Sequence, residues 1–240
     1  MKNSMQAKRA GRIKFSVLSG LLMAVQMASA AEPQLAGIYQ AIADGRVLPG
    51  GLRNAGSPDA IAVLPAALQA AAQATTGVEE KPADPYKLCQ SVGPFRMMSL
   101  PTVKFEFVPA QGRVVMLFED LSRGYMRSFY MQRPHPAQIT PDYAYQGDSI
   151  AKWQGDTLVI DTIGFNDRTW LNAITQASDA LHLVERIRPI QNGRYLEYKV
   201  TASDSKVLSK PYSYVRYFEK TSVEIEEDLC EPDSNWRPDL

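Results

Sequence analysis

The stretch LHLVERIRPIQNGRYLEYKVTA at positions 181–202 decides the fold. Apolar and polar residues alternate over 181–188 and again over 195–202, and a period of two predicts β-strands that bury one face. Asn192-Gly193 lies between the two runs, and this dipeptide tolerates the positive φ that tight hairpins require. The stretch therefore predicts an antiparallel hairpin.

The same pattern continues around this hairpin, where short runs rich in Val, Ile, Phe and Tyr are separated by Gly, Asp, Asn and Pro. Gln111-Gly112 and Gln154-Gly155-Asp156 are turn-like connections. The further strands that we expect are 103–108, 113–120, 125–132, 149–153, 157–163 and 212–220. About eight strands in mostly sequential hairpins predict a mainly β fold, an antiparallel up-and-down barrel of lipocalin (calycin) type, because closure removes exposed sheet edges. A curved open sheet with a helix is the alternative.

Residues 31–100 differ from the barrel region, and we expect them to form a helical preamble and a linker. The composition is alanine-rich up to about Gly77, and Pro58-Asp59-Ala60 leads into an apolar run at 61–74 that predicts a helix. Pro65 would either kink this helix or place its start one residue earlier. The expected order is a signal peptide at 1–30, the preamble and linker at 31–100, the barrel at 101–227 and a C-terminal tail at 228–240.

The first 30 residues have the three parts of a secretory signal peptide. Five basic residues and no acid precede an apolar run at 15–25, and Ala28-Ser29-Ala30 follows as a cleavage site. A membrane anchor is the alternative, but the run is shorter than the roughly 20 residues that a span requires. No later segment is apolar enough to cross a bilayer. We therefore expect a periplasmic or secreted protein.

Cleavage would remove five of the 26 basic residues and none of the 26 acidic residues, which leaves a net charge of about minus five. Such a charge argues against nucleic acid or another polyanion as a partner. The two cysteines, Cys89 and Cys230, are expected to form a disulfide in an oxidising compartment. This bond would close a long loop and contribute roughly 4 kcal/mol in the chain-entropy model.

The strand 181–188 carries the most informative candidates for chemistry. Alternation places Glu185 on a face with leucine and isoleucine, and His182 and Arg186 on the other face. Either orientation puts an ionisable group inside the barrel, where a buried carboxylate must be paired, hydrogen bonded or protonated. The alternative to a catalytic role is a cross-strand salt bridge of Glu185 with Arg216 or Lys199.

A second cluster combines Arg127 with the corner Arg133-Pro134-His135-Pro136. The two prolines restrict the backbone of His135, which could be aimed at a barrel mouth or lie in a solvated loop. Aromatic residues nearby could line a ligand site or belong to the core, and phenols near the C-terminal strand could donate to a ligand oxygen. These residues are Tyr143, Tyr145, Trp153, Phe165, Trp170 and Tyr214.

Familiar catalytic signatures are missing from the sequence: there is no nucleophile elbow, phosphate-binding loop, dinucleotide motif or His-Glu-x-x-His. With only two histidines, a multi-histidine metal site cannot be built, although a mixed His and carboxylate site could. We therefore expect no metal and no organic cofactor.

Several groups of residues carry a resemblance: Asp84-Pro85, Cys89, Gly93-Pro94 and Arg96, the Arg-Pro-His-Pro corner, the run 153–162 and Gly164-Phe165-Asn166-Asp167. With them, the chain resembles a set of exported, poorly characterised bacterial proteins of sphingomonads and acidobacteria that share a Trp-x-Gly-Asp-Thr-Leu hairpin and a Leu-His-Leu-x-Glu-Arg strand. The likeness covers roughly 84–231 and departs near Cys230, where the ending is longer. It implies a polar site that includes Asp161 and Asp167.

Two functional hypotheses follow. In the first, the barrel is an enzyme, a lyase, isomerase or hydrolase that acts on a small apolar or aromatic substrate with His182, Glu185 and His135 as the catalytic groups. In the second, it is a lipocalin-like carrier of a small hydrophobic ligand. The expected ligand-binding residues are Arg127, Arg133, Arg186, Tyr145, Trp153, Trp170 and Tyr214. The oligomeric state is left open.

The mature protein is predicted to begin at Ala31. Intact-mass measurement of exported material should give a chain without the first 30 residues, because a signal peptidase cleaves after the small-x-small site. Exported protein that still begins with Met1 would contradict the prediction.

Overall fold

The computed structural model describes residues 35–74, 85–119, 126–138 and 145–226. Contacts divide the chain after Ala31, and the unit from Glu32 to Leu240 contains every described residue. The proposed signal peptide, the C-terminal tail and Cys230 lie outside the described residues, so the export of the chain and the pairing of Cys89 with Cys230 remain predictions.

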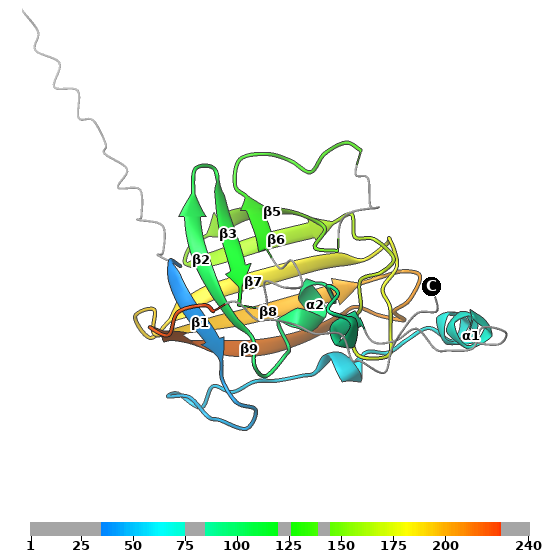
Figure 1. The fold of residues 1–240 in the computed structure, drawn as a ribbon, viewed down its shortest axis with the longest axis horizontal. Helices are drawn as coiled ribbons and strands as arrows, with labels where there is room; N and C mark the ends of the chain where they lie inside the picture. Colours follow the sequence, from blue (N-terminus) through cyan, green and yellow to red (C-terminus); the bar gives the residue numbers. More distant parts are fainter. Residues whose placement is uncertain (1–34, 75–84, 120–125, 139–144, 227–240) are drawn as a thin grey trace, which may run out of the picture. The chain divides into compact units, whose positions relative to one another are not determined.

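Within the described part of the chain, nine strands follow one another around a closed barrel (Figure 1). All eight expected strands are present, so a closed, mainly β barrel is confirmed. The strands are β1 (Gly37–Ala41), β2 (Lys104–Ala110), β3 (Arg113–Phe118), β4 (Met126–Tyr130), β5 (Asp148–Gln154), β6 (Thr157–Ile163), β7 (His182–Ile190), β8 (Tyr195–Ser203) and β9 (Tyr212–Thr221).

The ninth strand, β1, lies in the range that was expected to be a helical preamble. It pairs antiparallel with both β2 and β9 and so closes the barrel. Its side chain Tyr39 is fully buried, with ring centroids 6.0 Å from Phe105 and 6.2 Å from Phe107. Partners far along the chain stabilise this short strand, which the local alanine-rich composition did not reveal. The barrel therefore begins well before residue 101.

The expected antiparallel up-and-down order is wrong at one place in the barrel, because β4 and β5 run parallel. Their pairing covers only two residue pairs, Phe129 with Ser149 and Tyr130 with Ile150. A parallel pair cannot be joined by a tight turn, so β4 and β5 need a longer connection. Residues 131–138, the described part of this connection that follows β4, carry the Arg-Pro-His-Pro corner, and we call them the return segment.

Helices are few in the described residues. The helix α1 (Pro65–Ala74) confirms the expected helix, and its first hydrogen bond runs from the amide of Leu68 to the carbonyl of Leu64, one residue before Pro65. The others are the short α2 (Pro94–Met97) and two 3-10 turns, η1 (Pro58–Ala60) and η2 (Pro85–Leu88). Among the described helices, none is long and apolar enough to cross a membrane.

The barrel interior is a packed aromatic core. The rings of Phe105 and Phe218 lie 4.9 Å apart, and Phe95 of α2 lies 5.0 Å from Tyr214 of β9. The hydroxyl of Tyr214 donates to the carbonyl of Phe95, so α2 is anchored to the barrel. Interiors of barrels of this size hold side chains or one small ligand. In the described residues, side chains fill it; the largest ones, each under 2% exposed, include Tyr39, Phe105, Phe107, Phe118, Phe129, Tyr198, Tyr214 and Phe218.

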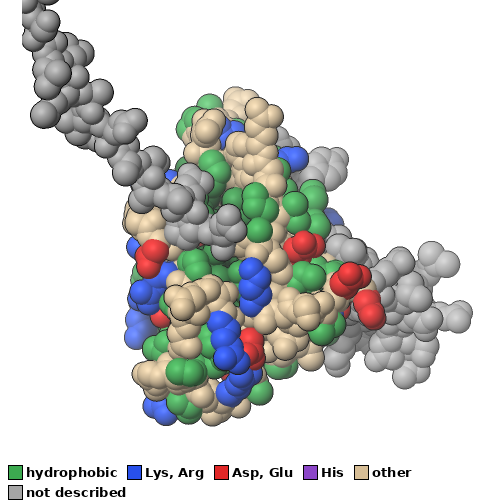
Figure 2. All heavy atoms as spheres, turned by 90° about the vertical axis from the view of Figure 1, so that its left-hand side faces the viewer, with side chains coloured by type: hydrophobic (Ala, Val, Ile, Leu, Met, Phe, Trp, Pro, Cys, Tyr) green, Lys and Arg blue, Asp and Glu red, His purple; other side chains and the backbone are tan. Residues whose placement is uncertain are grey.

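Most charged side chains lie on the surface, whereas Arg96, Arg127, Glu185, Asp204 and Arg216 are buried. On the face shown in Figure 2, basic and acidic side chains are interspersed with hydrophobic ones. Exposed ion pairs such as Arg188 with Glu197, 3.0 Å apart, contribute little because water screens them. The stability of the barrel therefore depends on its aromatic core and its strand pairing.

Candidate functional site

The orientation of β7 shows which of its ionisable side chains points into the barrel. Leu183, Glu185 and Ile187 are buried, whereas His182 and Arg186 lie on the outer face. The guanidinium of Arg127 on β4 forms two hydrogen bonds with the Glu185 carboxylate, Nη1 to Oε1 at 2.8 Å and Nη2 to Oε2 at 2.6 Å. The side chains are 1% and 0% exposed. Glu185 is therefore half of a buried ion pair.

Three hydroxyl side chains complete the surroundings of this pair. Tyr198 donates to Glu185 Oε1 at 2.8 Å, and Ser149 and Thr162, whose hydroxyls lie 2.9 Å apart, face Arg127 Nη2 at 3.4 Å. Burial, and then the negative charge of Glu185, raise the pKa of Tyr198, so its hydroxyl stays a donor. Burial lowers the pKa of Arg127, but the charge and the hydrogen bonds of Glu185, together with the nearby Tyr198 and Tyr214, outweigh burial and raise the pKa. The guanidinium of Arg127 therefore stays charged.

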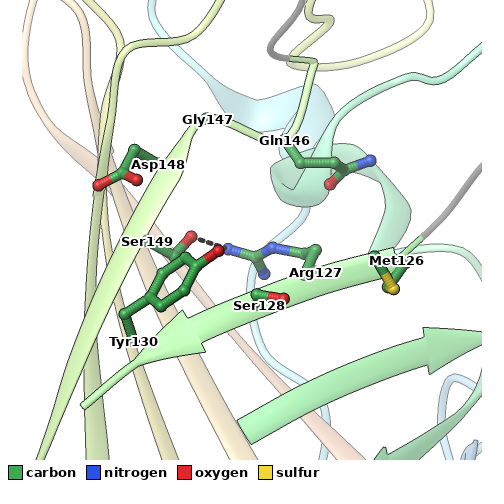
Figure 3. A pocket seen from close by; sticks show the side chains of 8 residues that line it. All are labelled: Met126, Arg127, Ser128, Tyr130, Gln146, Gly147, Asp148 and Ser149. Carbon is green, nitrogen blue, oxygen red and sulfur yellow. Dashed lines mark hydrogen bonds between the residues drawn. The ribbon is translucent and has the colours of Figure 1, made fainter. Parts of the chain in front are cut away.

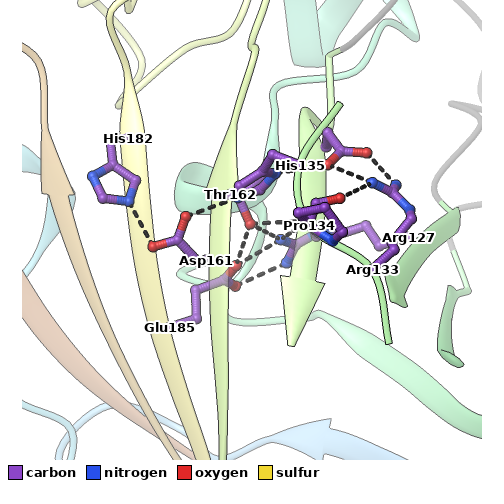
Figure 4. A network of polar contacts seen from close by, with 10 residues as sticks. Arg127, Arg133, Pro134, His135, Asp161, Thr162, His182 and Glu185 are labelled. Carbon is purple, nitrogen blue, oxygen red and sulfur yellow. Dashed lines mark hydrogen bonds and ion pairs between the residues drawn. The ribbon is translucent and has the colours of Figure 1, made fainter. Parts of the chain in front are cut away.

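A second group of polar side chains lies on the outer face, and we call it the outer cluster: Arg133, His135, Asp148, Asp161 and His182. His135 Nδ1 lies 2.7 Å from an oxygen of Asp148, and its Nε2 lies 2.9 Å from Oδ1 of Asp161. His182 Nε2 lies 2.9 Å from Oδ2 of the same Asp161 (Figure 4). The only two histidines of the chain therefore share one carboxylate.

The β5–β6 hairpin explains why the two acids of the outer cluster share a face. Its turn is Gly155-Asp156, with Gly155 at φ 64°, and the register pairs Ile150 with Asp161. Asp148 lies two residues before Ile150, on the same face. Asp148 was not among the residues expected at the site, although the expected turn and the period-two alternation together predict its place on this face.

Carboxylates surround the imidazole of His135 in the outer cluster. Each ring nitrogen lies within hydrogen-bond distance of one aspartate, so every N–H that the ring carries has an acceptor. Burial raises the pKa of Asp161, but hydrogen bonds from His182 and His135 outweigh it and hold the pKa below its usual value. At Asp148 burial is likewise outweighed by Arg133 and His135. Arg133 also donates to Asp148 and lies 3.9 Å from the Tyr130 ring centre.

A cleft of about 560 Å³ adjoins the outer cluster. It lies between the return segment and the outer face of β5 and β6, and Arg133, Pro134 and Asp161 line it. The rest of its wall is mixed in character: Met131, Gln132, Ile150, Ala151, Lys152, Gln154 and Val159. The cleft thus offers apolar contact beside two cationic side chains and one carboxylate.

The structure brings only some of the expected site residues together. His135, His182 and Arg133 meet on the outer face, whereas Glu185 and Arg127 lie inside the barrel. The expected salt-bridge partners of Glu185 were wrong: Lys199 is exposed, and Arg216 donates to the carbonyl of Gly56. The partner, Arg127, comes from β4, and no local pattern indicated a contact across the barrel.

Of the remaining candidates, Tyr214 lies beside the inner pair, with its ring centroid 6.2 Å from that of Tyr198. Arg186 is exposed and donates to Oε1 of Gln154 at 3.3 Å. Trp153 packs against the core, Trp170 is 5% exposed, and Tyr214 is buried against α2. Tyr145 is half-buried, and its carbonyl accepts from Thr169. The expected aromatic wall is therefore divided between core positions, and Tyr143 lies outside the described residues.

Within the described residues, no group of three or more His, Cys, Asp or Glu side chains is arranged to hold a metal ion. Comparison with known proteins returned no matching family model and no matching curated protein. Arguments about function therefore rest on the geometry of the chain itself.

Removing one partner of the buried ion pair should lower the free energy of unfolding far more than removing both partners. Arg127→Met leaves the Glu185 charge unpaired, so we expect a loss of about 3–5 kcal/mol of unfolding free energy. Replacing Glu185 by Leu as well should restore most of it. Urea unfolding measures both, and Arg188→Met on the exposed pair with Glu197 is the control, with an expected loss of about 0–1 kcal/mol. A double variant as unstable as the single one would contradict this account.

The outer cluster should make stability depend on pH in the acid range. Because the folded pKa of Asp161 lies below its usual value, its ionised form stabilises the fold above roughly pH 4, the unfolded pKa of Asp. This contribution is lost as pH falls through the lower folded pKa. Asp161→Asn should therefore be less stable than wild type at pH 7, and the gap should close in acid. Melting curves from pH 7 to pH 2 measure it; a gap that persists at the lowest pH would rule out this origin.

Proposed function

We propose that the protein is an exported enzyme of the lyase, isomerase or hydrolase type that moves protons at the outer cluster and binds a small, partly apolar substrate in the adjoining cleft. The observation that carries this proposal is the contact of both histidines with Asp161, one at each carboxylate oxygen, at the wall of the cleft. The resemblance to exported bacterial proteins, and with it a periplasmic or secreted location, remains part of the proposal.

The outer cluster supplies both a proton acceptor and a proton donor. Asp161 accepts from Nε2–H of His182, which makes Nδ1 the basic nitrogen, and no described residue forms a hydrogen bond with Nδ1. A proton taken at Nδ1 would be stabilised by the carboxylate on the opposite side of the ring. His135, which has a carboxylate beside each ring nitrogen, is the matching acid. An acid and a base that share one aspartate suit chemistry in which one proton leaves and another is added.

The cleft defines the kind of substrate. Met131, Ile150 and Val159 provide apolar contact, and Lys152 is an exposed cation on the same wall. Sites of this size enclose most of a small organic molecule. The cleft thus fits a compound with an apolar or aromatic body and one polar or anionic group, and the carrier hypothesis gains no support from an interior that aromatic side chains fill.

The test begins with a thermal-shift screen of small aromatic and aliphatic carboxylates, esters and lactones against the mature protein, followed by NMR assay of turnover for every compound that binds. For a compound that is turned over, His182→Gln should lower kcat by roughly 10²–10⁴-fold with a smaller change in binding, because general acid–base groups contribute that much.

Arg188→Gln is the matched control, since Arg188 lies on the same strand and outer face but pairs with Glu197 away from the cleft. It should keep wild-type turnover. Compounds that bind in the cleft without turnover, with equal affinity for wild type and His182→Gln, would refute the enzyme and establish a carrier.

A further inference from the structure

Three basic side chains lie in one row across the outer face of the barrel: Lys152 of β5, Arg186 of β7 and Lys199 of β8. The register pairs Lys152 with Val159, Val159 with Arg186, and Arg186 with Lys199, so the three point to the same side of the sheet. All are exposed, and none forms an ion pair with an acidic side chain of the described residues. Like charges directly opposite each other destabilise a sheet. The row therefore carries positive charge that the described part of the chain does not balance.

Two of these cations meet at one end of the cleft, where Lys152 and Gln154 of β5 form part of the wall. Arg186 belongs to β7, but its Nη1 and Nη2 donate to Oε1 of Gln154 at 3.4 and 3.3 Å, so its guanidinium reaches across β6 toward the cleft. A guanidinium has five N–H donors, and one acceptor cannot use them all. The same contact leaves Nε2 of Gln154 as a further donor. This end of the cleft thus combines two cations with a neutral donor.

The acidic side chains of β6 and β8 on this face are already bonded to other groups. Asp161 of β6 lies 2.9 Å from a ring nitrogen of each histidine. Glu197 of β8 accepts from Arg188 at 3.0 Å. The charges of Lys152 and Arg186 are therefore available to a ligand.

A pocket of about 240 Å³ between β4 and β5 has no available cation of this kind (Figure 3). The basic residue in its lining is Arg127, whose two Nη atoms are bonded to Glu185. An anion placed there would lose its hydration without gaining a free counter-charge. An anionic group therefore fits the end of the cleft and not this pocket.

We propose that Lys152, Gln154 and Arg186 form a subsite of the cleft for an oxyanion, a carboxylate or phosphate group, so that the substrate is an organic anion. The inference rests on the proposed function, because it takes the outer cluster as the reacting end. An anion between Lys152 and Arg186 lies over Val159, and Asp161 is two residues further along β6, roughly 7 Å away. A body about as long as one aromatic ring therefore joins the charged group to the atom that reacts.

Benzoate, benzamide and benzamidinium test the subsite, since they have nearly the same shape and differ in charge. In titrations of the mature protein followed by ¹⁵N-resolved NMR, benzoate should shift the side-chain amide signal of Gln154. It should bind at least about tenfold more tightly than benzamide, a difference of ~1.4 kcal/mol, and benzamidinium should bind most weakly. Phenyl phosphate is titrated alongside, and the tighter of the two anions identifies the oxyanion. If neither anion binds more tightly than benzamide, the proposal is wrong.

Single variants check that the anion binds at these side chains. Arg186→Gln and Lys152→Met should each weaken benzoate binding about tenfold, with a much smaller effect on benzamide. Arg188→Gln is the matched control, because it removes one positive charge from the same strand and face but from a residue that is paired with Glu197. It should bind benzoate like wild type. Equal weakening by Arg186→Gln and Arg188→Gln would show that only the net charge matters, and would overturn the subsite.

The result for the subsite can be told apart from the result for the enzyme. If benzoate binding depends on Arg186 but no organic anion is turned over, the subsite stands and the proposed reaction is wrong. If a substrate is turned over with a KM that Arg186→Gln and Lys152→Met leave unchanged, the enzyme stands and the subsite is wrong.

Discussion

The outer cluster and the adjoining cleft depend on the parallel pairing of β4 with β5. Antiparallel neighbours can be joined by a two-residue turn, but a parallel neighbour requires the chain to travel back along the barrel. The return segment carries His135 over the outer face, where it meets Asp148 and Asp161. The pairing covers only two residue pairs, and a pocket of about 240 Å³ lies beside it, although Nε of Arg127 stays buried there. One irregular step in an otherwise antiparallel barrel thus creates both an outer cleft and an opening in the wall.

The buried ion pair of Arg127 and Glu185 determines the register of the strands rather than adding to the stability of the core. Taking Arg127 and Glu185 out of water is costly, and apolar side chains of similar volume would stabilise the core as well. The pair instead restricts which arrangement is allowed, because it joins β4 to β7 across the barrel. A shift of β7 by one residue would turn Glu185 outward and His182 inward. That shift would leave Arg127 buried without a counter-ion and remove His182 from Asp161, so the inner pair also maintains the outer cluster.

Local patterns in the sequence were enough for most of the barrel. Period-two alternation identified eight strands, and Gly155 marked a turn that the structure contains. The pattern failed where partners lie far apart along the chain: β1 is five residues long and is stabilised by β2 and β9. The same distance along the chain explains which contacts of the site the sequence did not predict. Both histidines were recognised as candidates, but their shared contact with Asp161 depends on where the return segment lies. The contact of Arg127 with Glu185 depends on the positions of β4 and β7 in the barrel.

Asp148 and Asp161 each serve more than one basic side chain of the outer cluster. The carboxylate of Asp148 accepts from Arg133 and lies 2.7 Å from Nδ1 of His135. Asp161 lies 2.9 Å from a ring nitrogen of both His135 and His182. These contacts outweigh burial and hold the pKa of each aspartate below its usual value, so the loss of one contact would raise the pKa of the carboxyl that it leaves. Because His135 lies between the two aspartates, the charges of the whole cluster depend on one another.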